Sequence, residues 1–294
     1  MTSSMKWAAA ALLLSVAATA HAAPDAEVES VQMPAWMVRA DQRSPLEAGG
    51  LLRNGDRIET GPGSRALLRL GDGSVVKLGE NARFEMADMQ GGGTGKRVFK
   101  ATLSVVEGAF RFTTAAVYKF AGRREIDVRF RTVTAGIRGT DLWGKSAADR
   151  EIVCLIEGHI SVTRLGDAPV QMEQSQTVYQ ALASGGAPQV AHVEPAQLAK
   201  WAAETEIAAG SGAARKGGKW RVYLQQSRSG DELAELSSRL AEAGYPARIA
   251  RLPAEGKPAY WIYIGSLPDR SEARALADTL RTQFKLGTVS ISTE

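Results

Sequence analysis

The stretch Trp220-Arg-Val-Tyr-Leu-Gln-Gln226 decides how the C-terminal third of this 294-residue chain should fold. Apolar residues at every second position are typical of a β-strand that packs one face on a core. Three further strand patterns and two amphipathic helix patterns follow. The strands are expected at 220–226, 247–252, 260–265 and 288–292. Capping-box spacings of Ser229 with Glu232 and of Asp269 with Glu272 should begin the helices. This βαββαβ order predicts an α+β, ferredoxin-like domain over residues 218–294.

Residues 33–183 have a different pattern, made of short alternating strands and glycine-rich turns. In one example, Ala66, Leu68 and Leu70 alternate with polar or outward positions before the Gly71-Asp-Gly73 turn. Residues 152–156 are apolar on both faces, which is typical of a central strand. Many short strands separated by such turns predict an all-β sandwich or roll.

Residues 184–217 separate these two patterns. A short helix is expected after Pro195, and it is followed by Gly210-Ser-Gly-Ala-Ala-Arg-Lys-Gly217. The composition of this second stretch is typical of a flexible linker. The chain is therefore expected to be multi-domain, with an all-β domain, a linker and an α+β domain.

The first 22 residues have the pattern of a secretory signal peptide. Lys6 precedes an apolar run from Trp7 to Ala20, and Ala20-His-Ala22 gives a small-x-small cleavage site. The run is shorter than the ~20 residues that a membrane span needs. We therefore expect cleavage near Ala22, a periplasmic location and no membrane span after cleavage; a retained anchor is the alternative.

One face of the predicted C-terminal sheet should be open, because both helices of this fold pack on the other face. Side chains alternate along a strand, so Val222, Leu224, Ile262 and Ile264 should face the helices. The open face should then carry the remaining residues of the two central strands. These are Arg221, Tyr223, Gln225, Trp261 and Tyr263.

We call Tyr223, Trp261 and Tyr263 the aromatic platform. Aromatic rings offer flat apolar faces to bases or to the C–H faces of sugars, and Gln225 and Arg221 can add hydrogen bonds. Export from the cytoplasm favours a glycan over RNA. The alternative interpretation is a platform that the β domain or a terminal segment covers.

The C-terminal residues also resemble a known family. The stretch 220–226, together with Tyr260-Trp-Ile-Tyr-Ile-Gly-Ser-Leu267 and Ser271-Glu-Ala273, resembles the SPOR domain over roughly 218–293. The resemblance implies a βαββαβ fold whose open sheet face binds peptidoglycan glycan strands stripped of their stem peptides, at the bacterial division septum. The chain departs from the family pattern in two places. Its first strand has Val222-Tyr-Leu-Gln-Gln-Ser227 where the family usually has Val-Gln-Leu-Gly-(Ser/Ala)-Phe, and Trp261 replaces a frequent arginine.

Four blocks in the β region resemble the FecR domain. They are Gly55-Asp-Arg-Ile-Glu-Thr-Gly-Pro-Gly-Ser-Arg-Ala66, Leu70-Gly-Asp-Gly-Ser-Val-Val-Lys-Leu-Gly79, Thr132-Val-Thr-Ala-Gly-Ile-Arg-Gly-Thr-Asp141 and Ile156-Glu-Gly-His-Ile-Ser-Val162. The family's sensors relay a transporter signal through a transmembrane helix to a cytoplasmic sigma factor. A transmembrane helix and a cytoplasmic segment are not expected in this chain, so we do not expect it to relay a signal across the inner membrane by itself.

Composition and motifs give no sign of catalysis. The formal net charge of +4 is too diffuse to indicate a nucleic-acid partner. The stretch 91–96 only partly matches a phosphate-binding loop. Two histidines in the mature chain and the lone Cys154, which should be buried, are too few for an expected metal site. The stretch 136–141 is interpreted either as a binding loop or as a turn in which Arg138 pairs with Asp141.

We therefore expect a non-enzymatic envelope protein without a cofactor or metal, whose partner is denuded peptidoglycan glycan. The β domain is expected to present a surface to an envelope protein. The alternative is a soluble periplasmic sensor or signalling component of a FecR-like system.

Overall fold

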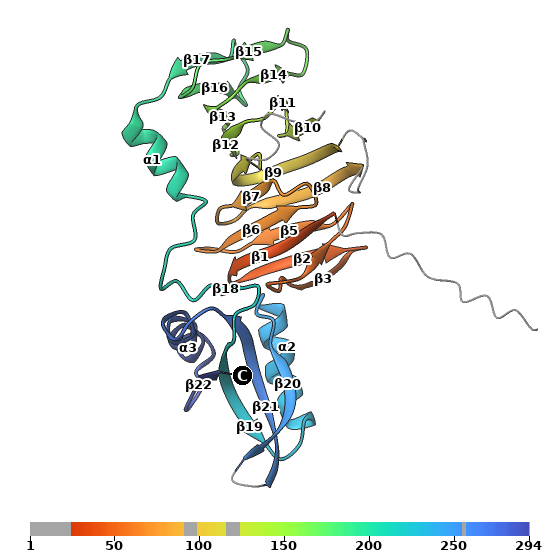
Figure 1. Cartoon of the computed structure of the whole chain (residues 1–294), viewed down its shortest axis with the longest axis vertical. Coiled ribbons are helices and arrows are strands. Elements are labelled where there is room, and N and C mark those ends of the chain that lie inside the picture. The colour runs from red at the N-terminus through yellow and green to blue at the C-terminus, as the bar shows by residue number, and fades with distance from the viewer. Residues whose placement is uncertain (1–24, 91–98, 116–123, 255–256, 294) are drawn as a thin grey trace, which may run out of the picture.

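The computed structural model describes residues 25–90, 99–115, 124–254 and 257–293 (Figure 1). The chain is mostly β, with an elongated stack of strands followed by a smaller region of sheet and helices. Among the described residues, no helix has the length and apolar composition that a membrane span needs. The expected signal peptide and the stretch 91–96 lie outside the described residues.

Two sheets form the N-terminal stack. One sheet contains β1 (Ala26–Gln32), β4 (Leu51–Leu52), β6 (Arg65–Leu70), β7 (Val75–Leu78), β12 (Asp141–Ser146), β13 (Arg150–Glu157), β16 (Thr177–Leu182) and β17 (Gln189–His192). The other contains β2 (Ala35–Arg39), β3 (Gln42–Pro45), β5 (Arg57–Thr60), β8 (Arg83–Gln90), β10 (Arg124–Arg129), β11 (Val133–Ile137), β14 (Ile160–Arg164) and β15 (Val170–Met172). The stack therefore starts at Ala26, earlier than the predicted boundary at residue 33.

A single long strand, β9 (Phe99–Thr113), joins the two sheets. Its first half pairs with β8 and β10, and its second half pairs with β7 and β12. Gly108 marks the change, with φ +89, and a Cβ at this position would lie 2.5 Å from the Cα atom of Ala82. Only glycine fits here, because both the positive φ and the close approach exclude a side chain.

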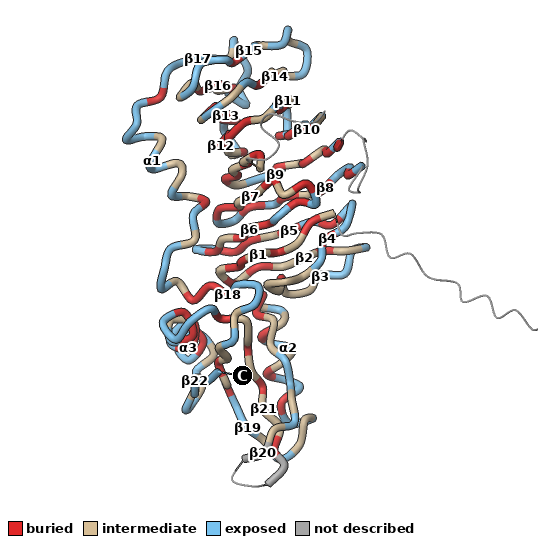
Figure 2. The backbone as a smooth tube through the Cα atoms, viewed as in Figure 1, coloured by how far each residue is buried: buried red, intermediate tan, exposed pale blue. Residues whose placement is uncertain are grey.

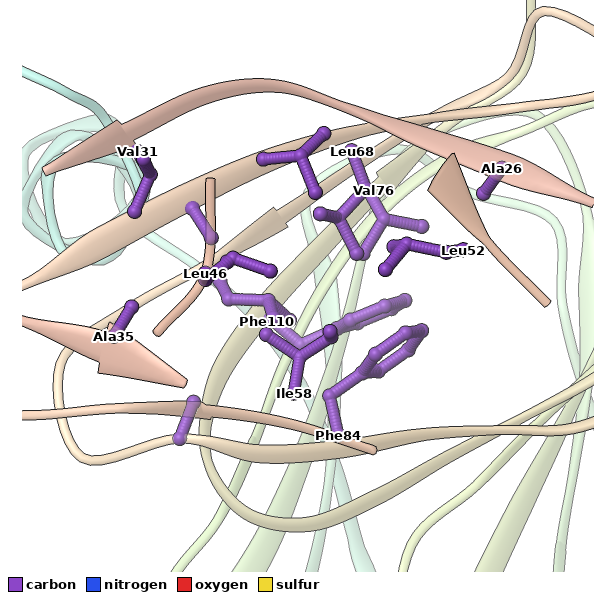
Figure 3. Packing of buried hydrophobic residues seen from close by; sticks show 14 of the residues in the cluster. Ala26, Val31, Ala35, Leu46, Leu52, Ile58, Leu68, Val76, Phe84 and Phe110 are labelled. Carbon is purple, nitrogen blue, oxygen red and sulfur yellow. The ribbon is translucent and has the colours of Figure 1, made fainter. Parts of the chain in front are cut away.

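The core lies between the sheets and follows from the alternation of the strands. Ala66, Leu68 and Leu70 are buried, as predicted, and Phe84 stacks on Phe110 with ring centroids 5.9 Å apart (Figure 3). The buried positions recur along the whole stack (Figure 2). β13 pairs with β12 on one side and β16 on the other, which confirms that it is a central strand.

The segment between the two regions is fixed in place. Helix α1 (Pro195–Ala203) lies along one side of the stack, and the chain continues to β18 (Ala214–Arg215), which pairs with β1 (Figure 1). We call residues 204–217 the strap. Its composition predicts a flexible linker, but its backbone is hydrogen bonded to both regions, through β1 on one side and Glu272 on the other.

The C-terminal region contains four antiparallel strands in the order β20-β21-β19-β22. Its elements are β19 (Trp220–Ser227), the 3-10 turn Asp231–Leu233, α2 (Ala234–Glu242), β20 (Arg248–Ala254), β21 (Lys257–Leu267), α3 (Arg270–Phe284) and β22 (Ser290–Thr293). Val222, Leu224, Ile262 and Ile264 are buried in one core with Leu236, Leu240 and Leu276 of the helices. Both helices therefore pack on the face where these residues point.

The two predicted helix caps differ in outcome. Asp269 accepts a hydrogen bond from the Glu272 N–H at 2.9 Å and caps α3 as predicted. The predicted box of Ser229 and Glu232 is wrong, because a 3-10 turn precedes α2 and the Glu232 carboxylate accepts from the Ser227 hydroxyl instead. The Glu272 carboxylate does not complete a capping box, because it accepts hydrogen bonds from backbone N–H groups of the strap.

Candidate functional site

The three rings of the aromatic platform lie together on the sheet face opposite the helices. Tyr223 of β19 pairs directly with Tyr263 of β21, and their ring centroids are 5.6 Å apart at a tilt of 36°. Trp261 meets Tyr223 edge-on, also with centroids 5.6 Å apart. All three side chains are half-buried. The central position of β19 and β21 and the side-by-side placement of these rings agree with the sequence analysis.

A β-bulge changes the position of the predicted glutamine. The register shifts between Tyr223 and Gln225, so Gln225 lies opposite Ile262, a residue buried against the helices. The next residue, Gln226, takes the place opposite Trp261. The expectation that Gln225 shares the open face is therefore wrong, because a bulge adds one residue to β19 and reverses the alternation after it.

Two arginines flank the ring of Tyr263. The guanidinium carbon of Arg221 lies 4.8 Å from the ring centroid, which is a cation–π distance. Arg248 of β20 is the direct partner of Tyr263 on the other side. Sequence reasoning found Arg221 but missed Arg248, although the alternation along the second predicted strand puts Arg248 and Ala250 on the same face.

The open face is thus built of cross-strand rows. One row runs Arg248, Tyr263, Tyr223 and Ser290 across the four strands, and the next contains Ala250, Trp261 and Gln226. Cross-strand neighbours have Cβ atoms about 4.5–5.5 Å apart. The face therefore offers aromatic rings at its centre and hydrogen-bonding groups around them.

The N-terminal region reaches one end of this face. Glu47, from the loop after β3, forms an ion pair with Arg248 and accepts a hydrogen bond from its guanidinium. This hydrogen bond raises the pKa of the Arg248 guanidinium. Glu47, Arg221, Arg248 and Tyr263 line a small cavity of about 70 Å³. We call this contact the seam. The alternative of a covered platform thus holds at the seam end only, since Tyr223, Trp261 and Tyr263 all retain exposed surface.

The seam is held by main-chain contacts as well. The Ala35 N–H donates to the Gly244 carbonyl at 3.2 Å, and the Trp36 indole N–H donates to the Glu242 carbonyl at 3.1 Å. Gly244 has φ +83, and a Cβ there would lie 2.7 Å from the Trp36 ring. These contacts fix the platform relative to the N-terminal stack.

The loop at 136–141 does not contain the expected ion pair. Asp141 pairs with Arg111 at 2.8 Å, whereas Arg138 is exposed and lines a cleft of about 580 Å³ on the outer face of β10, β11 and β14. The pairing of Arg138 with Asp141 is therefore wrong. Asp141 lies at the start of β12, opposite β9, so the strand order brings Arg111 to it.

The remaining candidate groups are Cys154 and the residue types that could hold a metal ion. Cys154 is fully buried in β13, and burial raises the pKa of its thiol to about 12. Within the described ranges, histidine, cysteine and carboxylate side chains form no group of three that could hold a metal ion.

Comparison with known families gives two matches. Residues 56–161 match the family described as FecR protein, and residues 216–289 match the SPOR domain. No curated protein matches the chain.

Two crystal structures of a candidate anti-sigma factor from Parabacteroides distasonis ATCC 8503 are similar to parts of the structure. One is 13% identical and covers 78% of this chain and 91% of its own, and the other is 12% identical and covers 81% and 99%. Both have a TM-score of 0.41.

Proposed function

We propose that this chain, which matches the FecR family over 56–161 and the SPOR domain over 216–289, is a non-enzymatic cell-envelope protein that binds peptidoglycan glycan strands. The ligand would be glycan stripped of its stem peptides, as the SPOR resemblance implies. We assign the β domain to 33–183 with the added strand β1, the connecting segment to 184–217 and the ferredoxin-like SPOR domain to 218–294. Export with cleavage near Ala22, a periplasmic location and recruitment to the division septum belong to the same proposal.

The observation that carries the proposal is the aromatic platform on the sheet face without helices. The ring of Tyr223 is tilted by 36° from that of Tyr263 and by 79° from that of Trp261, so the three rings offer differently oriented faces to successive sugars of a chain. Sugar rings have C–H faces that pack on aromatic rings, and hydroxyl groups that need hydrogen-bond partners at the edges. Arg221 and Gln226 supply such partners beside the rings. Gln226 replaces Gln225 in this role because of the bulge.

A second candidate function rests on the FecR match over 56–161. In that case the chain is a periplasmic regulatory component, in which the β domain contacts an envelope protein and the SPOR domain holds it at the wall. The cleft beside Arg138 is the first place to look for this contact, since most of its lining residues lie inside the matched range 56–161.

Sedimentation with purified sacculi tests the glycan proposal. Amidase-treated sacculi should retain the full-length protein better than untreated sacculi. The double substitution Trp261→Ala with Tyr263→Ala should weaken retention by about 1–3 kcal/mol for two rings, or roughly 5- to 150-fold. A matched variant, Trp261→Phe with Tyr263→Phe, keeps the rings and should keep most of the binding. Equal retention of the alanine variant and the unchanged protein would reject the platform as the binding surface.

Testing the regulatory alternative needs a different readout. Crosslinking from position 138 in cells should capture an envelope protein if the β domain is a contact surface. Crosslinking is repeated with the variant Trp261→Ala with Tyr263→Ala to distinguish the two functions. A protein that lies near position 138 only because both proteins bind the wall would no longer be captured.

A further inference from the structure

The seam end of the platform has the construction of a carboxylate-binding site. Arg221 and Arg248 lie on the two strands that flank Tyr263, one over its ring at 4.8 Å and one directly opposite it in register. Neighbouring positions across strands are about 4.5–5.5 Å apart. Arg221, Arg248 and Tyr263 also line one small cavity, so both arginine side chains reach the end of the ring where a stacked sugar would place its substituents.

A carboxylate from the other domain already binds there. Glu47 reaches across the seam and pairs with Arg248. The side chains of Arg248 and Glu47 are 64% and 43% exposed, so solvent and ligands can reach the pair. Exposed ion pairs of this kind are weak, because each group keeps most of its hydration. A second carboxylate can therefore displace Glu47 at little cost.

We propose that this end of the platform is a subsite for a carboxylate carried by the glycan, and that Glu47 occupies it while no glycan is bound. The inference rests on the proposed function. The lactyl group of muramic acid is joined to the stem peptide through an amide, and removal of the peptide leaves a free carboxylate. A stripped strand therefore brings one negative charge for each muramic acid, whereas an intact strand brings a neutral amide at that place.

This subsite gives a chemical reason for selecting stripped glycan. Guanidinium groups bind carboxylates through paired, charge-assisted hydrogen bonds, and they bind a neutral amide more weakly. Glu47 makes the selection sharper, since a neutral group cannot compete with it for Arg248. It also links ligand binding to the N-terminal stack, because the displaced Glu47 belongs to the loop next to β3.

The test uses calorimetric binding of two tetrasaccharides of alternating N-acetylglucosamine and N-acetylmuramic acid. One has free lactyl carboxylates and the other has lactyl carboxamides. The full-length protein is compared with Arg248→Gln and Glu47→Gln. Arg251→Gln is the matched control for the first, since Arg251 is an exposed arginine of β20 that pairs with Tyr260 on the other alternation. Glu125→Gln is the control for the second, since it removes an exposed ion pair with Lys100 between β9 and β10 of the N-terminal stack.

We expect Arg248→Gln to weaken binding of the carboxylate probe about 3- to 10-fold and Glu47→Gln to strengthen it about 2- to 5-fold. Binding of the carboxamide probe should stay unchanged in both variants, and the two control variants should bind both probes as the unchanged protein does.

The subsite is rejected if Glu47→Gln leaves binding of the carboxylate probe unchanged or changes binding of both probes equally. If the unchanged protein binds both probes equally well, the glycan proposal stands and the subsite fails. If it binds neither probe while Trp261→Ala with Tyr263→Ala also has no effect on sacculi, the proposed function fails, and the subsite fails with it.

Discussion

Two aromatic clusters on sheet faces, the pair Trp143 with Trp201 and the aromatic platform, differ in what covers them. Trp143 of β12 is fully buried, because Trp201 of α1 stacks on it with centroids 5.0 Å apart and rings nearly parallel at 4°. The aromatic platform has similar ring distances of 5.6 Å, but its rings are tilted and half-buried. A helix covers the first cluster, and both helices of the C-terminal domain lie on the other side of the second.

The difference shows which aromatic residues belong to the fold. The covered cluster is a small core of its own, with the members Ala109, Trp143, Ile152, Cys154, Val178 and Val193 and with Leu198 and Trp201 packed on it. The indole N–H of Trp143 is buried without a hydrogen-bond partner among the described residues. The packing of the Trp143 ring in this core outweighs the cost of burying its indole N–H without a partner. In the described part of the chain no helix lies over the aromatic platform, so its rings keep exposed surface.

Trp143→Ala gives the largest expected effect. Removal of the fully buried indole leaves a cavity and removes the ring on which Trp201 stacks. The free energy of unfolding should therefore fall by about 3–5 kcal/mol. Urea denaturation followed by tryptophan fluorescence and circular dichroism measures the change. Trp143→Phe keeps a ring under α1 and should lose less. A loss below about 1 kcal/mol for the alanine variant would mean that α1 does not depend on this contact.

The sequence alone predicted the placement of the platform rings on one sheet face. The alternation of apolar and aromatic residues along β19 and β21 predicted that the three rings share one face, because successive side chains of a strand point to opposite faces. The bulge that moves Gln225 was not predictable, since it is a local shift of pairing between two distant strands. The strap was also missed. Its ion pairs join Lys77 to Glu206 and Lys145 to Glu204, over separations that a local composition cannot reveal.

Glu272→Ala should have the next largest effect, because it releases the strap. Its carboxylate, which is buried, accepts hydrogen bonds from the backbone N–H groups of Gly210, Gly212 and Ala213 at 2.6, 2.6 and 3.0 Å. Hydrogen bonds to a charged group contribute about 1.5–3 kcal/mol, so a loss of about 2–3 kcal/mol is expected in the local opening of the strap.

Hydrogen exchange at these three amides measures the release of the strap. Glu235→Ala, an exposed glutamate in the first turn of α2, is the matched control and should leave the exchange rates unchanged. Unchanged protection in the Glu272 variant would show that β18 and the ion pairs of Glu204 and Glu206 fix the strap without Glu272.

The pH dependence of stability reports on the covered cluster through Cys154. Burial raises the pKa of the folded thiol to about 12, whereas an unfolded thiol has a pKa of about 8.5. The neutral thiol therefore contributes its full stability below the unfolded pKa, and this stability is lost as the pH rises toward the folded pKa. The loss is about 1.4 kcal/mol per pH unit between these values. Comparison with Cys154→Ala by denaturation at pH 8 and pH 10 should show the two proteins converging at pH 10. A constant difference would mean that the thiol titrates alike in both states.

Trp261→Ala should have the smallest effect on stability, and it completes the comparison with Trp143. The indole of Trp261 is half-buried and meets Tyr223 edge-on, so its loss forfeits one aromatic contact of about 0.5–1.5 kcal/mol and leaves an open surface in place of a cavity. We expect the free energy of unfolding to fall by about 1 kcal/mol or less, while retention on amidase-treated sacculi falls several-fold. Denaturation and sedimentation of the same preparation measure both quantities. A stability loss as large as that of Trp143→Ala would place Trp261 in the core of the domain, and the rings would then be part of the fold, as they are beneath α1.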